Sequence, residues 1–479
     1  MIGDDLGTLL SVGAFVIYCL AAWCIAQVIQ SRRSPQSIVA WGISLLAFPL
    51  LTLPLYAVLG RNRFHGYVRA HRTVFAETSR EARALEAVLQ THAVDPPEAL
   101  APFFATVRNI TALPFTGDNA ATLLINGEET YGSMLEAIAS AQDYVLLQSY
   151  IVHDDFIGRR FRDALVARAA AGVAVYFLYD EIGCVRLPNR YLKVLRAGGV
   201  TVAGFKTTRG PGNRWQINFR NHRKILVVDG RSAYLGGLNI GDEYLHRNPR
   251  FGHWRDTHLR LAGPAVQMTQ MAFLEDWYWA DRTVPALSWL PQPSPGDGLP
   301  AVVVRTGPAD AEASCALMVV QAFNSARRRL WVTAGYFVPD ETIIRSLQLA
   351  ALRGVDVRLL LPSKADIRSA WIASFATLPP LFEAGVKVFL YRDGVLHQKV
   401  ILVDDMLASV SSVNLDNRSL HINFEIMAFV ADPGFAAEVE RMLEADFARA
   451  EAFTQRSLDA KPYLFRLTAK AVHLAAPLL

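Results

Sequence analysis

The chain has 479 residues, of which 52% are hydrophobic and only 19% are charged. Folded soluble proteins carry about 25% charged residues, so this composition excludes a disordered chain and favours a membrane part joined to a soluble part. The net charge of +4 is too small by itself to indicate a nucleic-acid partner, but it suits an anionic membrane surface. The four cysteines form no CxxC pair, so neither a disulfide framework nor a zinc site is expected.

Two stretches without a charged residue lie near the N-terminus, at residues 6–31 and 34–60. Each is long enough to span a membrane, because about 20 helical residues cross about 30 Å of hydrocarbon. We therefore expect a transmembrane hairpin over residues 1–62, with spans at about 6–29 and 37–59.

Residues within and beside the hairpin predict a kink and an orientation in the membrane. Pro49 and Pro54 predict a kink in the second span. A cleaved signal peptide is the alternative interpretation, but Asp4 and Asp5 stand where that signal needs basic residues. More arginines follow the second span than lie between the spans, which predicts that the large C-terminal part is cytoplasmic: Arg61, Arg63, Arg69 and Arg72 against Arg32 and Arg33.

After the hairpin we expect a juxtamembrane helical linker over residues 63–114, and then alternating strands and helices. "DYVLLQSYIV" has the pattern of a strand, "RRFRDALVARAAA" that of a helix, and "VAVYFLYD" that of a buried strand. The same order returns in the second half as "RRLWVTAGYFV", "TIIRSLQLAALR" and "VDVRLLLP". Residues 285–300 between the two copies hold five prolines and two glycines, which is typical of a linker.

The fold class expected is therefore α/β, with two tandem duplicated domains related by a pseudo-twofold axis, at residues 115–284 and 301–450. A duplication of this kind commonly places one site at the interface between the halves. The C-terminal amphipathic segment is 451–479, and its last part, "KPYLFRLTAKAVHLAAPLL", mixes basic and apolar residues. This last part is similar to an interfacial amphipathic helix, and packing onto the domain is an equally open alternative.

Each copy contains one short polar signature. A histidine is followed by lysine after two residues, aspartate after seven and asparagine after seventeen: His222, Lys224, Asp229 and Asn239 in the first copy, and His397, Lys399, Asp404 and Asn414 in the second. The chain has only eight lysines, so two chance matches on independent repeats would be very rare. The repetition disfavours the alternatives of core histidines and solvated strand lysines.

The local pattern indicates which side chains act together. "HRKILVVD" and "HQKVILVD" read as strands, so each histidine and the lysine two residues later point to the same face. Asp229 and Asp404 have the opposite parity. They either support a catalytic site or close hairpins as turn residues, and the sequence leaves both interpretations open.

Two histidines at one site can divide the roles of nucleophile and acid between them. With an ordinary pKa of about 6.5, one imidazole can be neutral and nucleophilic while the other is protonated and acidic. Each imidazole also needs an acceptor that orients its second nitrogen. Asp256 and Glu425 occupy matching strand starts in the two halves, and we predict that they are these acceptors. The alternative is that they are exposed strand-end carboxylates.

The doubled HxKxxxxD pattern resembles the hallmark of the phospholipase D superfamily. More narrowly, the chain is similar to bacterial cardiolipin synthases in the N-terminal hairpin, "RNHRKILVVDGRSAYLGGLNIGDEY", "WRDTHLRL", "GYFVPD" and "LHQKVILVDDMLASVSSVNLDNRSLHINFE". The resemblance covers nearly the whole chain. It departs from the family at Gly236-Gly237 and Ser411-Ser412, where members often have Gly-Ser.

The resemblance implies a multi-pass phosphatidyltransferase of the bacterial inner membrane. It would take the phosphatidyl group of one phosphatidylglycerol, release glycerol, and pass the group to a second phosphatidylglycerol. The resemblance further implies that His222 is the nucleophile and His397 the acid and base, although the residues alone leave these two roles open. Lys224 and Lys399 would offset phosphate charge.

Asn239 and Asn414 would donate hydrogen bonds to phosphate. The expected partners are a phospholipid and the membrane. No nucleic acid, cofactor or metal is expected, and a homo-oligomer is left open. The alternatives are a phospholipase D-type hydrolase or nuclease, a transphosphatidylase that uses another acceptor alcohol, and a non-catalytic membrane scaffold. The products distinguish the enzymes, and insensitivity of activity to His222→Ala would indicate the scaffold.

Overall fold

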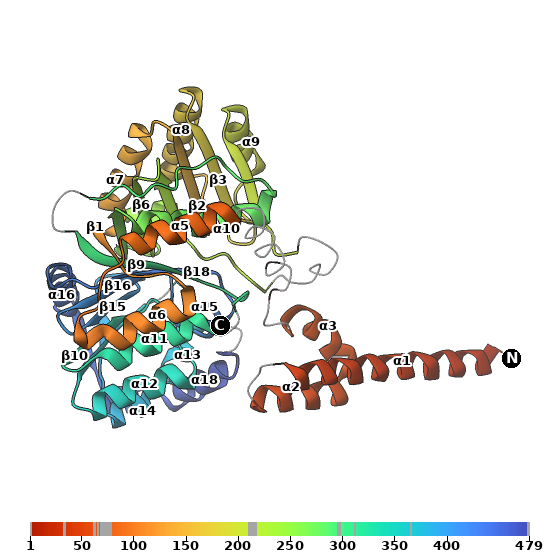
Figure 1. The fold of residues 1–479 in the computed structure, drawn as a ribbon. Helices are drawn as coiled ribbons and strands as arrows, with labels where there is room; N and C mark the ends of the chain where they lie inside the picture. Colours follow the sequence, from red (N-terminus) through yellow and green to blue (C-terminus); the bar gives the residue numbers. More distant parts are fainter. Residues whose placement is uncertain are drawn as a thin grey trace. The chain divides into compact units, whose positions relative to one another are not determined.

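The computed structural model describes residues 2–31, 35–60, 64, 67, 79–208, 218–294, 298–310, 313–364 and 366–476. The chain divides into two compact units. One consists of Met1–Gly66 with Thr207–Phe219, and the other of Tyr67–Lys206 with Arg220–Leu479. The first unit contains the N-terminal helices and the second contains a large β-sheet with its covering helices (Figure 1).

The N-terminal unit contains α1 (Ile2–Gln30), α2 (Pro35–Ala47) and α3 (Pro49–Leu59). Within the described residues, Leu10–Gln30 of α1 is the one stretch long and apolar enough to cross a membrane. The expected second span is not one continuous helix. It breaks at Phe48, whose φ of −136° and ψ of 56° are not helical, because Pro49 has no N–H to continue the helix. The arginines on which the predicted orientation depends lie outside the described residues.

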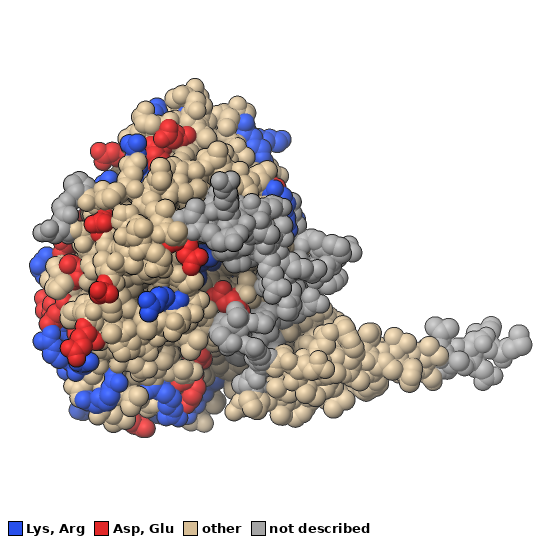
Figure 2. Space-filling model, viewed as in Figure 1, with Lys and Arg blue, Asp and Glu red and all other residues tan. Residues whose placement is uncertain are grey.

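The three N-terminal helices pack through a small apolar cluster. Ala21, Cys24 and Val28 of α1 are buried with Leu45 of α2 and Tyr56 of α3. Most other apolar side chains of these helices are exposed, and Figure 2 shows no charged side chain on their described surface. Such an apolar exterior is typical of a membrane environment.

The second unit begins with α5 (Ser79–Thr91), η1 (Glu98–Leu100) and α6 (Ala101–Thr111), so the expected helical linker is divided. The elements of the first half of the sheet follow: β1 (Thr116–Ile125), α7 (Asn126–Ser140), β2 (Tyr144–Ser149), α8 (Phe156–Ala170), β3 (Ala174–Asp180), α9 (Asn189–Ala197), β4 (Thr201–Phe205), β5 (Ile225–Val228), β6 (Ser232–Gly236), η3 (Asp242–Leu245), β7 (Trp254–Arg255), β8 (Thr257–Ala262) and α10 (Ala265–Asp281).

The second half repeats this series and then extends it. Its elements are β9 (Leu299–Thr306), α11 (Ser314–Ser325), β10 (Arg329–Thr333), β11 (Phe337–Val338), α12 (Glu341–Leu352), β12 (Asp356–Pro362), α13 (Arg368–Ser374), α14 (Pro379–Glu383), β13 (Lys387–Tyr391), β14 (Val395–Leu396), β15 (Val400–Val403), β16 (Leu407–Ser411), β17 (Leu415–Asp416), α15 (Asn417–His421), β18 (Glu425–Val430), α16 (Pro433–Phe447), β19 (Ala450–Phe453), α17 (Gln455–Asp459) and α18 (Tyr463–His473).

The sheet has 15 strands in the order β19-β13-β12-β10-β15-β16-β18-β9-β1-β8-β6-β5-β2-β3-β4. Counted outward from the central pair β1 and β9, both halves have the same strand order, with β19 added at one edge. β1 and β9 are antiparallel, with Thr116 opposite Ala301. This arrangement confirms the tandem α/β fold and its pseudo-twofold relation. The segment 451–479 contains most of the edge strand β19, then α17, and then α18 within the stretch where a helix was expected.

The sequence pattern of the strands explains their depth in the molecule. β2, β5, β15 and β18 are buried at every residue, as expected for near-continuous apolar runs in a sheet covered on both faces. α10 is buried from Ala265 to Trp279. The strands β5 and β15 that belong to the signatures, and their neighbours, therefore lie in the core.

Candidate active site

Each histidine is carried by one half of the sheet and is bonded to the backbone of the other. The amide of His222 donates to the carbonyl of Phe424 at 2.9 Å, and that of His397 donates to the carbonyl of Arg255 at 2.8 Å. Matching parallel pairings flank these bonds, Asn221 with Phe424 and β14 with β7. Because the acceptor in each case directly precedes a carboxylate residue, each histidine meets an acid from the opposite half.

These acids are Glu425 and Asp256. Nδ1 of His222 lies 3.0 and 3.1 Å from the two carboxylate oxygens of Glu425, and Nδ1 of His397 lies 2.8 Å from Oδ2 of Asp256. Both carboxylates are completely buried, so they are not the exposed strand-end groups of the alternative interpretation. Each contact occupies one ring nitrogen and leaves Nε2 for another partner.

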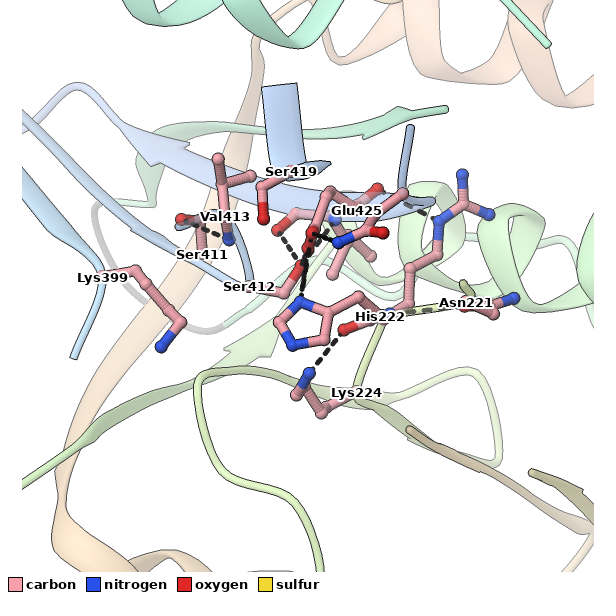
Figure 3. A network of polar contacts seen from close by, with 12 residues as sticks. Asn221, His222, Lys224, Lys399, Ser411, Ser412, Val413, Ser419 and Glu425 are labelled. Carbon is pink, nitrogen blue, oxygen red and sulfur yellow. Dashed lines mark hydrogen bonds and ion pairs between the residues drawn. The ribbon is translucent and has the colours of Figure 1, made fainter. Parts of the chain in front are cut away.

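The two lysines share the buried space of the histidines. Lys224 Nζ donates to the carbonyl of His222 at 2.6 Å, and Lys399 Nζ lies 3.0 Å from Nδ1 of His397 and donates to its carbonyl. Figure 3 shows Glu425 on one side of the His222 ring and Lys224 on the other. Each lysine thus lies beside the histidine two residues earlier, although both residues precede the strands β5 and β15 on which strand parity was expected to place them.

Burial controls the charges of the site. Desolvation lowers the pKa of His222 to about 4, although Glu425 acts in the opposite direction. Desolvation also lowers the pKa of Lys224 to about 7 and lowers those of His397 and Lys399. At pH 7 these shifts favour the neutral form of both imidazoles. An anionic phosphate would favour protonation of the lysines and of one imidazole.

The carboxylates remain charged despite their burial. Desolvation alone would raise the pKa of Glu425, but the contact with His222, the charge of Lys224 and the hydrogen bond from Ser412 together lower the pKa below its ordinary value. The pKa of Asp256 is likewise lowered, because the hydrogen bond to His397 and the charge of Lys399 outweigh desolvation. Each imidazole thus faces a fixed negative charge at Nδ1.

Both asparagines are buried, and their hydrogen-bond partners differ. Asn239 accepts the amide of Ile151 at 3.1 Å and donates to the hydroxyl of Tyr244 at 2.8 Å. Oδ1 of Asn414 is buried without a hydrogen-bond partner among the described residues. Oδ1 of Asn239 therefore fixes the loop after β2, whereas Oδ1 of Asn414 makes no such contact among the described residues.

The aspartates of the signature lie away from the histidines, at the opposite end of the strand. Asp229 and Asp404 have positive φ angles of 52° and 51° in the turns after β5 and β15. Asp229 accepts three backbone amides, from Gln142 to Tyr144, at 2.8–2.9 Å. Asp404 accepts those of residues 327–329 at 2.8–3.2 Å. Their expected place in the catalytic group is corrected, because they are turn residues that fix the segment before β2 and before β10.

Two tyrosines that the motif analysis did not identify also line the site. The Tyr150 ring lies 5.0 Å from that of His222, and the Tyr336 ring lies 5.6 Å from that of His397. The Tyr336 hydroxyl donates to Asp366 at 2.7 Å. The repeat of "SYIV" in "GYFV" aligned these tyrosines, but only the fold brings them beside the histidines.

Buried ion pairs hold the strands on which the acids lie. Arg223, between the first histidine and lysine, pairs with Asp276 at 2.9 Å and donates to the carbonyl of Glu425 at 3.1 Å. In the other half Arg255 pairs with Asp446 at 2.7 Å. Such pairs contribute to a unique backbone position more than to stability. No sequence signal distinguished them from ordinary surface charges.

This geometry has clear parallels among known proteins. A family profile described as "Cardiolipin synthase, PLD-like domain" matches residues 134–250 and 319–447, and one described as "Phospholipase_D-nuclease N-terminal" matches residues 19–61. The chain is 45% identical to cardiolipin synthase A of Pseudomonas aeruginosa over 477 residues, covering 98% of this chain and 96% of the relative. It is 42% identical to the same enzyme of Pseudomonas entomophila, covering 97% of both chains.

A solved structure supports the fold. The crystal structure of phosphatidylserine synthase from Haemophilus influenzae superposes with a TM-score of 0.62 and 15% identity, over 79% of this chain and all of that one. With both profile segments, the full-length relatives and the doubled histidine site in agreement, the chain belongs to the cardiolipin synthase family of phospholipase D-like phosphatidyltransferases.

Proposed function

We propose that this enzyme makes cardiolipin from two molecules of phosphatidylglycerol through a phosphohistidine intermediate. One observation carries the proposal: two buried histidines lie in one site, each with Nδ1 against a charged carboxylate from the opposite half. This contact keeps the proton on Nδ1 and the lone pair on Nε2, which a nucleophile and a general base both need.

The first step transfers the phosphatidyl group to the protein. Nε2 of His222 attacks phosphorus, and the P–O bond to the glycerol headgroup breaks. His397, protonated once anionic phosphate occupies the site, gives its proton to the departing oxygen, so glycerol leaves neutral. Lys224 and Lys399 offset the charge of the pentacoordinate phosphorus, and Glu425 stabilises the positive charge that forms on His222.

The second step reverses these roles. A terminal hydroxyl of a second phosphatidylglycerol gives its proton to His397 and attacks phosphorus, and the P–N bond to His222 breaks. Cardiolipin leaves, and His222 returns to its neutral state. Water would give phosphatidic acid instead, so a membrane-bound acceptor at high local concentration favours transfer.

The membrane arrangement is part of the proposal. We assign both N-terminal apolar segments to a multi-pass anchor in the bacterial inner membrane, with the catalytic halves at residues 115–284 and 301–450 on the cytoplasmic side. The apolar exterior of α1 supports the anchor. Accessibility of a C-terminal reporter tests the side, and a periplasmic reporter would contradict this orientation.

The reaction is tested with the purified full-length protein in detergent and phosphatidylglycerol as the only lipid. We expect cardiolipin and glycerol in equal amounts, with no effect of a chelator, and loss of both products in His222→Ala and in His397→Ala. Phosphatidic acid as the main product would mean that water is the acceptor. Cardiolipin from the His222→Ala variant would exclude the proposed intermediate.

A further inference from the structure

The last helix, α18, exposes an apolar stripe instead of burying it. Tyr463, Leu464 and Leu467 are 73%, 70% and 49% exposed, and Leu474 directly after the helix is 85% exposed. Ala471 between them is also exposed. Tyr463 and Leu464 precede Leu467 by four and three residues, and Ala471 and Leu474 follow at steps of four and three, so these positions lie on one side of the helix. An apolar stripe of this kind on a folded surface commonly marks an interaction site.

The opposite side of α18 is firmly packed. Phe465 contacts the rings of Trp371 and Phe375, with ring centroids 6.1 and 5.3 Å apart. Val472 and Ala476 pack with Val338 and with a buried alanine of α13. The exposed stripe is thus held on a fixed helix and does not arise from a loose end of the chain.

The charged residues on α18 are basic. Arg466 and Lys470 lie on the helix and Lys461 lies just before it, and no acidic residue occurs from Ala460 to Leu479. Arg466 reaches back to Asp459 at 3.4 Å. An apolar face with basic flanks fits the boundary between the headgroups and the acyl chains of an anionic bilayer better than it fits another protein surface.

We propose that α18 and Leu474 dock the catalytic unit onto an anionic membrane surface, with the stripe Tyr463, Leu464, Leu467 and Leu474 inserted among the lipids. This contact is additional to the N-terminal helices. The packed side of the same helix contacts Val338. The carbonyl of Val338 also accepts a hydrogen bond from the side-chain Nδ2 of Asn417 at 3.1 Å. Val338 follows Tyr336, the tyrosine beside His397, by two residues, so docking holds this side of the site close to the lipid headgroups.

The direct test measures where the stripe lies in proteoliposomes of the full-length protein. A Cys19→Ser background removes the exposed cysteine, because the other three are buried. Leu467→Cys carries an environment-sensitive dye, and Leu352→Cys on α12, where the leucine is 72% exposed, is the matched control. We expect spin-labelled lipid to quench the dye at 467 several-fold more than at 352. The excess should be larger in phosphatidylcholine vesicles that contain phosphatidylserine than in pure phosphatidylcholine, and smaller at high salt.

Two outcomes would overturn the proposal. Equal quenching at both positions would leave the stripe in water. Shielding of the dye at 467 from aqueous iodide without quenching by lipid would mean that protein covers it, either the N-terminal unit or a second copy of the chain. This readout does not depend on the reaction products, so it remains valid if the protein does not make cardiolipin.

An activity measurement uses the same matched pair of helices. Leu464→Glu with Leu467→Glu should raise KM for phosphatidylglycerol in vesicles roughly tenfold or more, since two inserted leucines are lost. It should leave kcat in detergent micelles unchanged. Leu349→Glu with Leu352→Glu on α12 should change neither value. An equal effect of both pairs, or no effect of the α18 pair, would contradict docking.

Discussion

Replacement of Glu425 by glutamine tests the electrostatic part of the mechanism with little change of shape. The carboxylate is completely buried, lies 3.0–3.1 Å from Nδ1 of His222, and also contacts the hydroxyl of Ser412 and Nδ2 of Asn423. Glutamine can retain polar contacts to the serine and the asparagine, but it removes the negative charge. It can also present an N–H to Nδ1, which would move the imidazole proton to Nε2 and block the nucleophile.

The expected size of the effect follows from the geometry. Opposite unit charges about 4 Å apart at an effective dielectric constant of about 20 interact by about 4 kcal/mol, which corresponds to about 10³ in rate. Loss of the correct tautomer adds to this, and loss of a carboxylate that orients a catalytic imidazole costs about 10⁴ in a well-studied triad. We therefore expect kcat for cardiolipin formation to fall by about 10³–10⁴ in Glu425→Gln.

The assay compares initial rates of glycerol release at saturating phosphatidylglycerol, with a thermal melt to establish that the variant is folded. Ser412→Ala is the matched control, because it removes a hydrogen bond to the same carboxylate while keeping the charge beside His222. Its kcat should fall by about tenfold, in line with one hydrogen bond to a charged group. A folded Glu425→Gln protein that keeps more than a tenth of the wild-type kcat would refute this account of the acid.

Three further predictions concern the turn residue Asp229, the close approach of Gly237 to Asp256, and the pH dependence of kcat/KM. Asp229→Asn should lower the free energy of unfolding by about 1–3 kcal/mol, seen as a lower Tm, while kcat changes little; a large loss of kcat at unchanged Tm would return this residue to the catalytic group. Gly237→Ala places a Cβ 2.0 Å from Oδ1 of Asp256, so it should displace this acid and lower kcat at least tenfold; wild-type activity would contradict this placement of the acid. The pKa of His222, about 4, predicts that kcat/KM falls on the acid side only near pH 4, as the nucleophile becomes protonated. On the alkaline side kcat/KM should fall well below pH 10.5, because burial lowers the pKa of the general acid His397 and lowers that of Lys224 to about 7. An acid limb at pH 6.5 would contradict the neutral imidazole.

The part of this molecule that the sequence predicted is the part with strong local repetition. The apolar strands of the two signatures, the matching positions of Asp256 and Glu425, and the tandem α/β order all follow from apolar runs and from internal alignment. The strands are shorter than the sequence predicts, because β5 begins at Ile225 and β15 at Val400, so each histidine and lysine lies just before its strand. The pairing of each histidine with the acid of the opposite half needs the fold, because the bonds to Phe424 and Arg255 join residues far apart in the chain.

Other features could not be read from local pattern. The break at Phe48 depends on where one proline begins a helix, and a kinked helix and a broken helix have the same composition. Asp229 and Asp404 left two interpretations open, since a turn residue and a catalytic acid can occupy the same motif position. The strand β19 has only four residues, too few to show a pattern, and is recognisable only beside β13.

The most direct test of the two-histidine site is to trap the intermediate. In His397→Ala a donor with a p-nitrophenol leaving group needs no proton to depart, so the first step should still occur and the second should be slow. We predict a burst of one nitrophenol per active site and a phosphatidyl adduct on the peptide that contains His222, found by mass spectrometry. His222→Ala should show no burst with the same donor. A burst in His222→Ala with the adduct on His397 would reverse the assigned roles, and the absence of any covalent adduct in both variants would contradict the mechanism.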